Sequence, residues 1–209
     1  DPFRKKGIDV IFYKLNKNLK PDKSYLAKQI ILNKTKVVLL MNFFGIAPIQ
    51  ETAKFLKKKF PDLIIIEDIT HSLFSIDISS SNLINFSVGS IRKWIGIPDG
   101  AILLSKLDIL NKPKYTNNQF VEKRKVALQL KREYETTGDI RTKKNFRKLF
   151  GDAELFLNEN YEYMPCSKES VRFIMSLDIH KIILKRYNNL RVLLNIIQFI
   201  KGIHIIKPI

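Results

Sequence analysis

The residue types best suited to chemistry follow two neighbouring strand-like stretches. Leu63–Ile66 is an unbroken apolar run, β-branched in three of four positions, which is typical of a strand buried on both faces of a parallel sheet. Glu67 and Asp68 follow it directly, at the carboxyl end, where open α/β sheets bind their ligands. A second short strand is predicted over Ile84–Val88, and Lys93 comes shortly after it. The pattern therefore predicts a carboxylate and a lysine near the carboxyl ends of two strands.

A carboxylate and a lysine in these positions are two parts of a pyridoxal-phosphate site. The lysine amine forms a Schiff base with the cofactor, and the carboxylate keeps the pyridine nitrogen protonated, so that the ring accepts electrons. Trp94 stands beside Lys93 and would shield its ammonium from water. Arg92 is a further candidate for binding the phosphate. We predict that Asp68 and Lys93 serve one cofactor.

These residues also carry a resemblance to a known family. The chain is similar to the fold-type-I aminotransferases, in particular the DegT/DnrJ/EryC1/StrS sugar aminotransferases, through Glu67-Asp68-x-x-His71, then Ser90-x-x-Lys93, then Asp99-Gly100 and an apolar strand. The resemblance implies that Asp68 pairs with the pyridinium nitrogen, His71 lies near the phenolic oxygen, and Lys93 holds the cofactor. It also implies transfer of an amino group from an amino-acid donor to a keto-sugar.

The chain departs from the family pattern at three places. Asn42-Phe43-Phe44-Gly45 resembles the family's His-x-Tyr-Gly turn, with asparagine in place of histidine. Phe86-Ser87 stands one residue further from the lysine than in the common family form, so either Ser87 or Ser90 is the serine that contacts the phosphate. The family's upstream glycine- and serine-rich loop is absent, and the chain is expected to be a fragment that is short at both ends.

Composition indicates a folded protein. Of 209 residues, 45% are hydrophobic, which supports a sizeable core. Cys166 is the single cysteine, so an internal disulfide is excluded and a reducing, cytoplasmic location is expected. The apolar runs are far shorter than the ~20 residues that cross a bilayer, and we expect no membrane contact.

Strands and helices are predicted to alternate in the first half of the chain. We expect a strand over Ile8–Tyr13, a helix capped by Asp22 or Ser24 that runs to about Leu32, a strand over Val37–Met41, and a helix opened by Pro48. This order is typical of parallel strands joined by right-handed crossovers. The fold class is therefore α/β, with the three-layer, mostly parallel sheet of a fold-type-I large domain. An antiparallel strand over Ala101–Leu104 is expected at or near the sheet edge.

The second half of the chain is predicted to be helical. A polar pair of helices is expected between Asn117 and Asn158, interrupted at Thr136-Thr137-Gly138. Ser167 or Ser170 would cap the next helix, a long connecting helix would follow, and Ile203–Ile206 would begin a small domain. We expect residues 1–165 to form the cofactor-binding large domain and residues 166–209 to begin the second domain.

The formal net charge of +17 also suggests a basic nucleic-acid-binding protein. The lysines are spread over the chain, and we expect no specific nucleic-acid partner. Between Lys112 and Lys148 the excess of basic residues predicts an exposed helical surface, with a surface for substrate phosphate as the alternative. The few, scattered His and Cys residues do not suggest zinc, and neither a Walker loop nor a G-x-S-x-G elbow is present.

The sequence favours a cytoplasmic, homodimeric aminotransferase that uses pyridoxal 5'-phosphate to aminate a nucleotide-linked keto-sugar in amino-sugar or polysaccharide biosynthesis. Two alternatives remain on the same fold: another pyridoxal-phosphate reaction, such as dehydration, or a catalytically silent relative. Outside the fold, the alternative is the basic nucleic-acid-binding protein.

Overall fold

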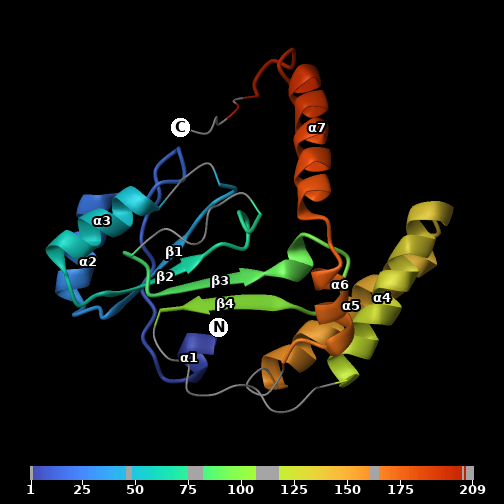
Figure 1. Ribbon diagram of the computed structural model, residues 1–209, viewed down its shortest axis with the longest axis horizontal. Coiled ribbons are helices and arrows are strands. Elements are labelled where there is room, and N and C mark those ends of the chain that lie inside the picture. The colour runs from blue at the N-terminus through green and yellow to red at the C-terminus, as the bar shows by residue number, and fades with distance from the viewer. Residues whose placement is uncertain are drawn as a thin grey trace. The chain divides into compact units, whose positions relative to one another are not determined.

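The computed structural model describes residues 2–45, 49–74, 82–106, 118–160, 165–203 and 205. Within these ranges the chain is an α/β protein built around a four-stranded sheet, shown in Figure 1. The strands lie in the order β1-β2-β3-β4, with the bounds Val37–Met41, Ile64–Asp68, Phe86–Ser90 and Ala101–Ser105. The first three are parallel. The α/β class and the mostly parallel sheet predicted from the sequence are confirmed.

The last strand, β4, is an edge strand that runs against β3. The Ile91 N–H donates to Gly100 O at 3.1 Å, and the Lys106 N–H donates to Asn85 O at 3.3 Å. Residue numbers therefore increase along one strand as they decrease along the other, which is the antiparallel pattern. The arrows of β3 and β4 point in opposite directions in Figure 1. The predicted antiparallel strand at the sheet edge is therefore confirmed.

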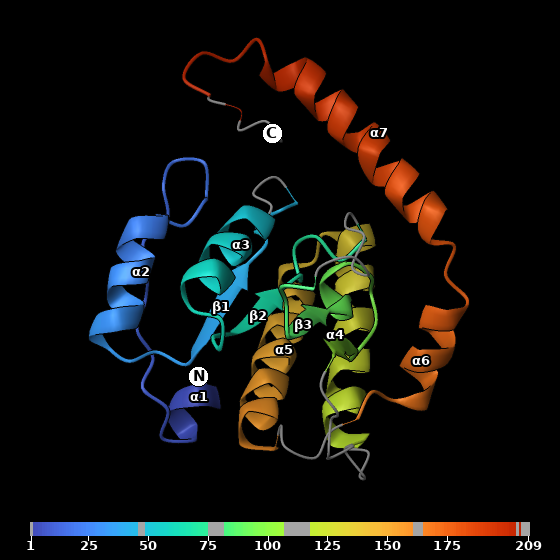
Figure 2. The ribbon, with the colours of Figure 1, turned by 60° about the vertical axis from the view of Figure 1, so that its left-hand side comes forward.

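The chain divides into two compact units. The helical unit comprises Asp1–Ile11, Ser90–Ile102 and Leu107–Met175, and the sheet unit comprises Phe12–Gly89, Leu103–Lys106 and Ser176–Ile209. In the sheet unit, α2 (Lys23–Leu32) and α3 (Gln50–Lys59) are neighbours, as Figure 2 shows. Asp22 caps α2 by accepting the Tyr25 N–H, as predicted. Pro48, the predicted start of the next helix, lies outside the described residues.

One hydrophobic core joins α2, α3 and the parallel strands. Its buried side chains lie at alternate positions of β1 and β2, on one face of each helix, and just before α3, β2 and β3: Leu26, Ile30, Val38, Leu40, Ile49, Ala53, Leu56, Leu63, Ile65 and Ile84. This alternation leaves the other face of each strand to different neighbours. The core therefore fixes which strand residues face the two helices.

The predicted strand over Ile8–Tyr13 is wrong. The described residues 8–13 form no strand, and they follow the short helix α1 (Pro2–Lys5). Ile8 and Phe12 expose 52% and 74% of their side-chain surface, so this β-branched and aromatic run has no sheet face to cover. Only Tyr13 joins the sheet unit's core, and its hydroxyl donates to Leu39 O at 3.1 Å.

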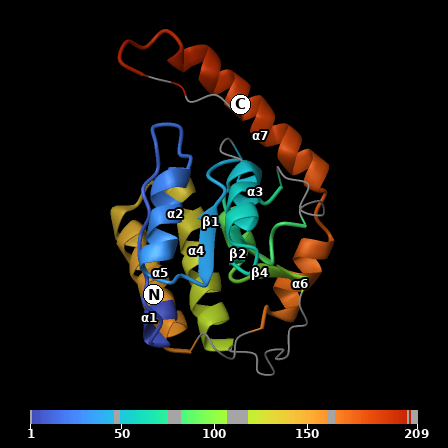
Figure 3. The same ribbon diagram turned by 90° about the vertical axis from the view of Figure 1, so that its left-hand side faces the viewer.

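The helical unit contains an antiparallel pair and a shorter helix. α4 (Asn118–Thr137) and α5 (Ile140–Asn160) lie side by side in Figures 2 and 3 and share a small core at Phe120, Val121 and Ala153. The predicted break at Thr136-Thr137-Gly138 is confirmed. α6 spans Lys168–Met175 and ends this unit, while α7 (Ile179–Ile197) belongs to the sheet unit and has no buried side chain. No helix within the described ranges is both long and apolar enough to cross a membrane.

A matched pair of isoleucines tests the core of the sheet unit. Ile30 and Ile31 are adjacent in α2, but Ile30 is 4% exposed and Ile31 is 58% exposed. We expect Ile30→Ala to lower the free energy of unfolding by about 3 kcal/mol, because it removes buried methyl groups and leaves a cavity. Ile31→Ala should change it by less than ~1 kcal/mol. Urea unfolding followed by circular dichroism measures both, and equal losses would contradict the described packing.

Candidate functional site

The first part of the candidate site lies at the carboxyl ends of β1 and β2. The two strands pair in parallel, with Met41 opposite Asp68. The Asn42 N–H donates to Asp68 O at 2.9 Å, which continues the strand pairing into the turn after β1. Register alone therefore brings the Asn42-to-Gly45 turn next to the predicted carboxylate.

Asp68 lies at the carboxyl end of β2. It is half-buried at the last position of β2, on the face opposite to that of Glu67. Its Oδ1 accepts the Thr70 N–H at 2.8 Å, which orients the carboxylate. Among the described residues, no other donor binds this carboxylate, so it can accept a hydrogen bond from a protonated ring nitrogen.

His71 packs against the turn that follows β1. Its ring stacks on Phe44 with centroids 4.7 Å apart and an interplanar angle of 16°, and it meets the edge of Phe43 at 6.1 Å. Phe44 adopts a positive φ of 56°, and Gly45 follows with φ 72°, so the chain turns sharply here. The sequence motif of the turn and the predicted His71 are thus neighbours in space.

One nitrogen of His71 lacks a partner. Nδ1 is buried and makes no hydrogen bond within the described part of the chain. A buried polar atom without a partner is costly, by about 1–3 kcal/mol. His71 Nδ1 therefore has the capacity to form a hydrogen bond with a ligand.

A buried polar pair that sequence reasoning missed stands on the other face. Asn42 is 1% exposed and Glu67 is 6% exposed. Asn42 Nδ2 donates to Glu67 Oε1 at 3.2 Å, while Asn42 Oδ1 is buried and makes no hydrogen bond to the described residues. Burial raises the pKa of Glu67, and the hydrogen bond from Asn42 lowers it by less. The sequence could have indicated this pair, because each residue comes two positions after a core residue of its strand and therefore lies on the same face as that residue.

The two candidate serines occupy different positions on β3. Ser87 is 7% exposed and pairs in register with Glu67, on the buried face of the strand. Ser90 ends β3 and is partly exposed, two residues after Val88, which pairs with Asp68. Ser90 therefore lies at the accessible end of β3, whereas Ser87 is buried within it.

Lys93 belongs to the helical unit. It ends the short 3-10 helix η1 (Ile91–Lys93) directly after β3, and its side chain is exposed. Its joint action with Asp68 and His71, which belong to the sheet unit, stays a prediction.

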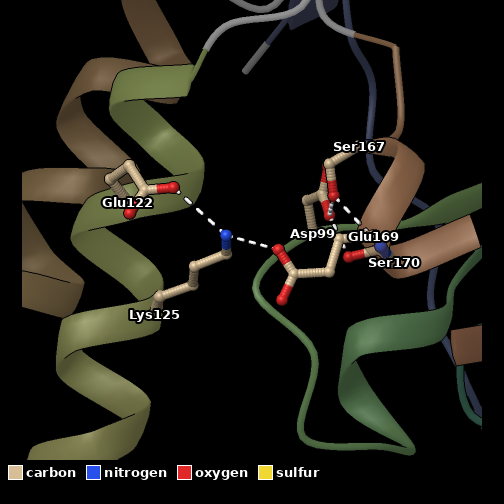
Figure 4. A network of polar contacts seen from close by, with 6 residues as sticks. All are labelled: Asp99, Glu122, Lys125, Ser167, Glu169 and Ser170. Atoms are coloured by element: carbon tan, nitrogen blue, oxygen red, sulfur yellow. Dashed lines mark hydrogen bonds and ion pairs between the residues drawn. The ribbon is translucent and has the colours of Figure 1, made fainter.

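The turn after Lys93 is anchored by a buried carboxylate. Asp99 is 7% exposed and accepts the Ser167 N–H at 2.6 Å, the Ser167 hydroxyl at 2.8 Å, and the Ser170 hydroxyl. Ser167 Oγ in turn accepts the Ser170 N–H at 3.2 Å, so Ser167 is the capping serine. Figure 4 shows these contacts at the start of α6. They fix the segment between η1 and β4.

Two further groups flank this anchor. Lys125 of α4 binds Glu122 at 3.1 Å and also Glu169, as Figure 4 shows. Burial, with a smaller contribution from the charge of Asp99, raises the pKa of the Cys166 thiol to about 11. The thiol is therefore protonated at neutral pH and is a poor nucleophile.

The raised pKa of Glu67 predicts a pH dependence of stability. Between the carboxyl's ordinary pKa and its higher folded-state pKa, the folded chain holds more protons than the unfolded chain, so stability falls as pH rises through that window. Glu67→Gln removes this proton uptake but keeps an oxygen to accept the Asn42 bond. We therefore expect the stability of the variant relative to wild type to be greater at pH 7 than at pH 4. Urea unfolding at both pH values measures the gain.

An equal effect of Glu67→Gln at both pH values would contradict the raised pKa. Glu51→Gln is the matched control, because the Glu51 carboxylate is largely exposed and pairs only with Lys23 at 3.4 Å among the described residues. Its effect should be small at either pH.

Comparison with known proteins gives a similar solved structure of low sequence identity. No family model matches the chain, and no curated protein matches it. Among solved structures, a chain described as a NifS-like protein has 18% sequence identity and a TM-score of 0.43, over 56% of this chain. The match covers 33% of the NifS-like chain, so this protein spans about a third of that length.

Proposed function

We propose that this chain is the cofactor-binding part of a pyridoxal-phosphate-dependent aminotransferase. The observation that carries the proposal is the group at the carboxyl ends of β1 and β2. There, Asp68 presents a carboxylate that only Thr70 contacts among the described residues, and His71 stacks on Phe44 with Nδ1 unpaired. Lys93 supplies the amine, directly after the next parallel strand. Sequence motif and local geometry support the same chemistry.

The residues present fit the cofactor. Pyridoxal phosphate supplies a carbonyl that condenses with amines and a ring that withdraws electrons from the substrate carbon. Asp68 would hold a proton on the ring nitrogen through the charge of its carboxylate. His71 would donate or accept a hydrogen bond at the phenolic oxygen. Ser90 would bind phosphate, and it is preferred to the buried Ser87.

Lys93 has two roles in the proposal. Its Nζ would hold the cofactor through the cofactor's carbonyl group. The same amine would act as a general base that moves the proton on the substrate carbon. An exposed side chain in a short turn has the freedom that both roles require.

The substrate class follows from the resemblance of the motifs to the sugar aminotransferases. We propose a nucleotide-linked keto-sugar as amino acceptor, an amino acid as donor, and a place in amino-sugar or polysaccharide biosynthesis in the cytoplasm. A different pyridoxal-phosphate reaction, or a silent relative, is the second candidate, since Asn42 replaces the histidine of the family's turn motif. No sequence-specific binding of nucleic acid and no membrane role are proposed.

Covalent attachment of the cofactor tests the proposal. The chain mixed with pyridoxal phosphate should absorb in the visible range, and borohydride should fix the cofactor to the peptide that contains Lys93. Mass spectrometry of the digest identifies the labelled residue. Label on another lysine, with none on Lys93, would refute the assignment, and Lys93→Ala should abolish the label.

Asp68→Asn separates binding from chemistry in the same experiment. The amide keeps the shape of the side chain but removes the charge that stabilises the protonated ring nitrogen. We expect the label on Lys93 to persist, while amino transfer falls by roughly 100-fold or more, which is about 2.7 kcal/mol of barrier. Unchanged turnover would show that Asp68 only ends a strand.

We also propose a two-fold homodimer, because enzymes of the resembled type complete each site with residues of a second subunit. Sedimentation equilibrium should give twice the chain mass of 24.4 kDa for the active species. A monomer with full transaminase activity would contradict the shared site.

A further inference from the structure

Two arginines of the helical unit meet at a single carboxylate. Arg92 of η1 donates to both oxygens of Glu154, at 2.5 Å and 3.3 Å, and Arg124 of α4 donates to Oε1 at 3.2 Å. Burial raises the pKa of Glu154, but the hydrogen bond and charge of Arg92 and the charges of Arg124 and Lys93 lower it overall. Lys93 is therefore within electrostatic reach of the same carboxylate.

Aromatic rings hold the two guanidinium groups in place. Arg124 Cζ lies 4.8 Å from the centroid of Phe150 and 5.8 Å from that of Phe120. Arg92 Cζ also lies 5.8 Å from the centroid of the Phe120 ring. The side chains of Arg92 and Arg124 are 17% and 11% exposed. The two forks are consequently desolvated and restricted before any ligand binds.

The cluster has more positive charge and more donors than its described partners satisfy. Each guanidinium has five N–H donors, and Glu154 takes two from Arg92 and one from Arg124. Arg124 Nε is buried and makes no hydrogen bond within the described ranges. Asp99 also acts on Arg124 through its charge, but its oxygens already accept three hydrogen bonds from serines.

This imbalance suits a ligand with several negatively charged oxygens. Two neighbouring guanidinium groups repel each other, and burial together with the charge of Arg92 lowers the pKa of Arg124. A phosphate group relieves both problems, because its oxygens accept parallel N–H bonds from an arginine fork and carry up to two charges. A single carboxylate such as Glu154 compensates for one charge only.

We propose that Arg92 and Arg124 form a binding site for a phosphate group, with Glu154 holding the two guanidinium groups in position. Two ligands of the proposed enzyme carry such a phosphate group: the cofactor, with its 5'-phosphate, and a nucleotide-linked substrate, with its phosphates. The site goes beyond the proposed transamination and does not depend on covalent chemistry at Lys93.

Calorimetric titration of the full chain with pyrophosphate, in chloride-containing buffer at constant ionic strength, tests the site. We expect Arg124→Gln to weaken binding at least about tenfold, because it removes a charged fork. Lys125→Gln is the matched control: it removes the same charge from the next residue of α4, whose side chain binds Glu122 and Glu169 instead. It should change the affinity by less than about twofold, since its charge is already paired with two carboxylates.

Equal affinities for the Arg124→Gln and Lys125→Gln variants, or no binding of pyrophosphate at millimolar concentration, would overturn the proposal. The arginines would then only brace Glu154 within the fold. Should Arg124→Gln fail to fold by circular dichroism, Arg124→Lys replaces it. Lysine keeps the charge but lacks the fork, so weakened binding supports the site and unchanged binding refutes it.

Competition distinguishes the source of the phosphate. If pyridoxal phosphate displaces pyrophosphate and pyridoxal does not, the site takes the cofactor's phosphate. If uridine diphosphate displaces it and pyridoxal phosphate does not, the site takes the substrate's phosphate. If neither pyridoxal phosphate nor uridine diphosphate displaces pyrophosphate, the site binds an adventitious ion only, and the proposal is overturned. Arg124-dependent binding without a covalent cofactor on Lys93 would contradict the proposed function and leave this site standing.

Discussion

The parallel pairing of β1 with β2 is the constraint on which the candidate site depends. Because Met41 lies opposite Asp68, both strands end at the same level. The residues that follow the two strands are therefore close to each other. The Asn42 N–H then bonds to Asp68 O, so the turn that contains Phe43 and Phe44 starts from a fixed point. His71 closes the group by stacking on Phe44. A slip of one residue would exchange the two faces and remove this arrangement.

Alternation along β2 gives adjacent carboxylates opposite environments. Glu67 follows the buried positions of the strand and has its pKa raised by burial, whereas Asp68 lies on the half-buried face. The Glu67 carboxyl is therefore buried within the sheet unit, whereas the Asp68 carboxyl is accessible to a ligand. The same rule separates Ser87 from Ser90 on β3. Two acidic residues or two serines that look equivalent in the sequence are therefore not equivalent in the fold.

Much of the fold could be predicted from apolar runs and helix caps. Val37–Met41 is a strand at the predicted residues, because a short apolar run next to two amphipathic helices can be buried only within a sheet. β2 ends two residues later than predicted, since its parallel neighbour β1 continues to pair with it as far as Asp68. β3 also ends two residues later than predicted, at Ser90. Ile8–Tyr13 has the composition of a strand but no sheet to join, which composition cannot reveal. Strand propensity is a statement about packing partners more than about the chain itself.

The helical unit shows where prediction from one sequence stops. Arg92 and Glu154 are 62 residues apart, and Asp99 and Ser170 are 71 residues apart, and no local pattern relates either pair. The net charge of +17 indicated only a generally basic surface, and most such charges are solvated and contribute little to specific binding. Arg92 and Arg124 differ from these solvated surface residues. Aromatic rings and a single carboxylate hold their guanidinium groups in place and largely out of water. Recognition of an anion depends on such restrained and incompletely satisfied donors, and not on the number of lysines in the chain.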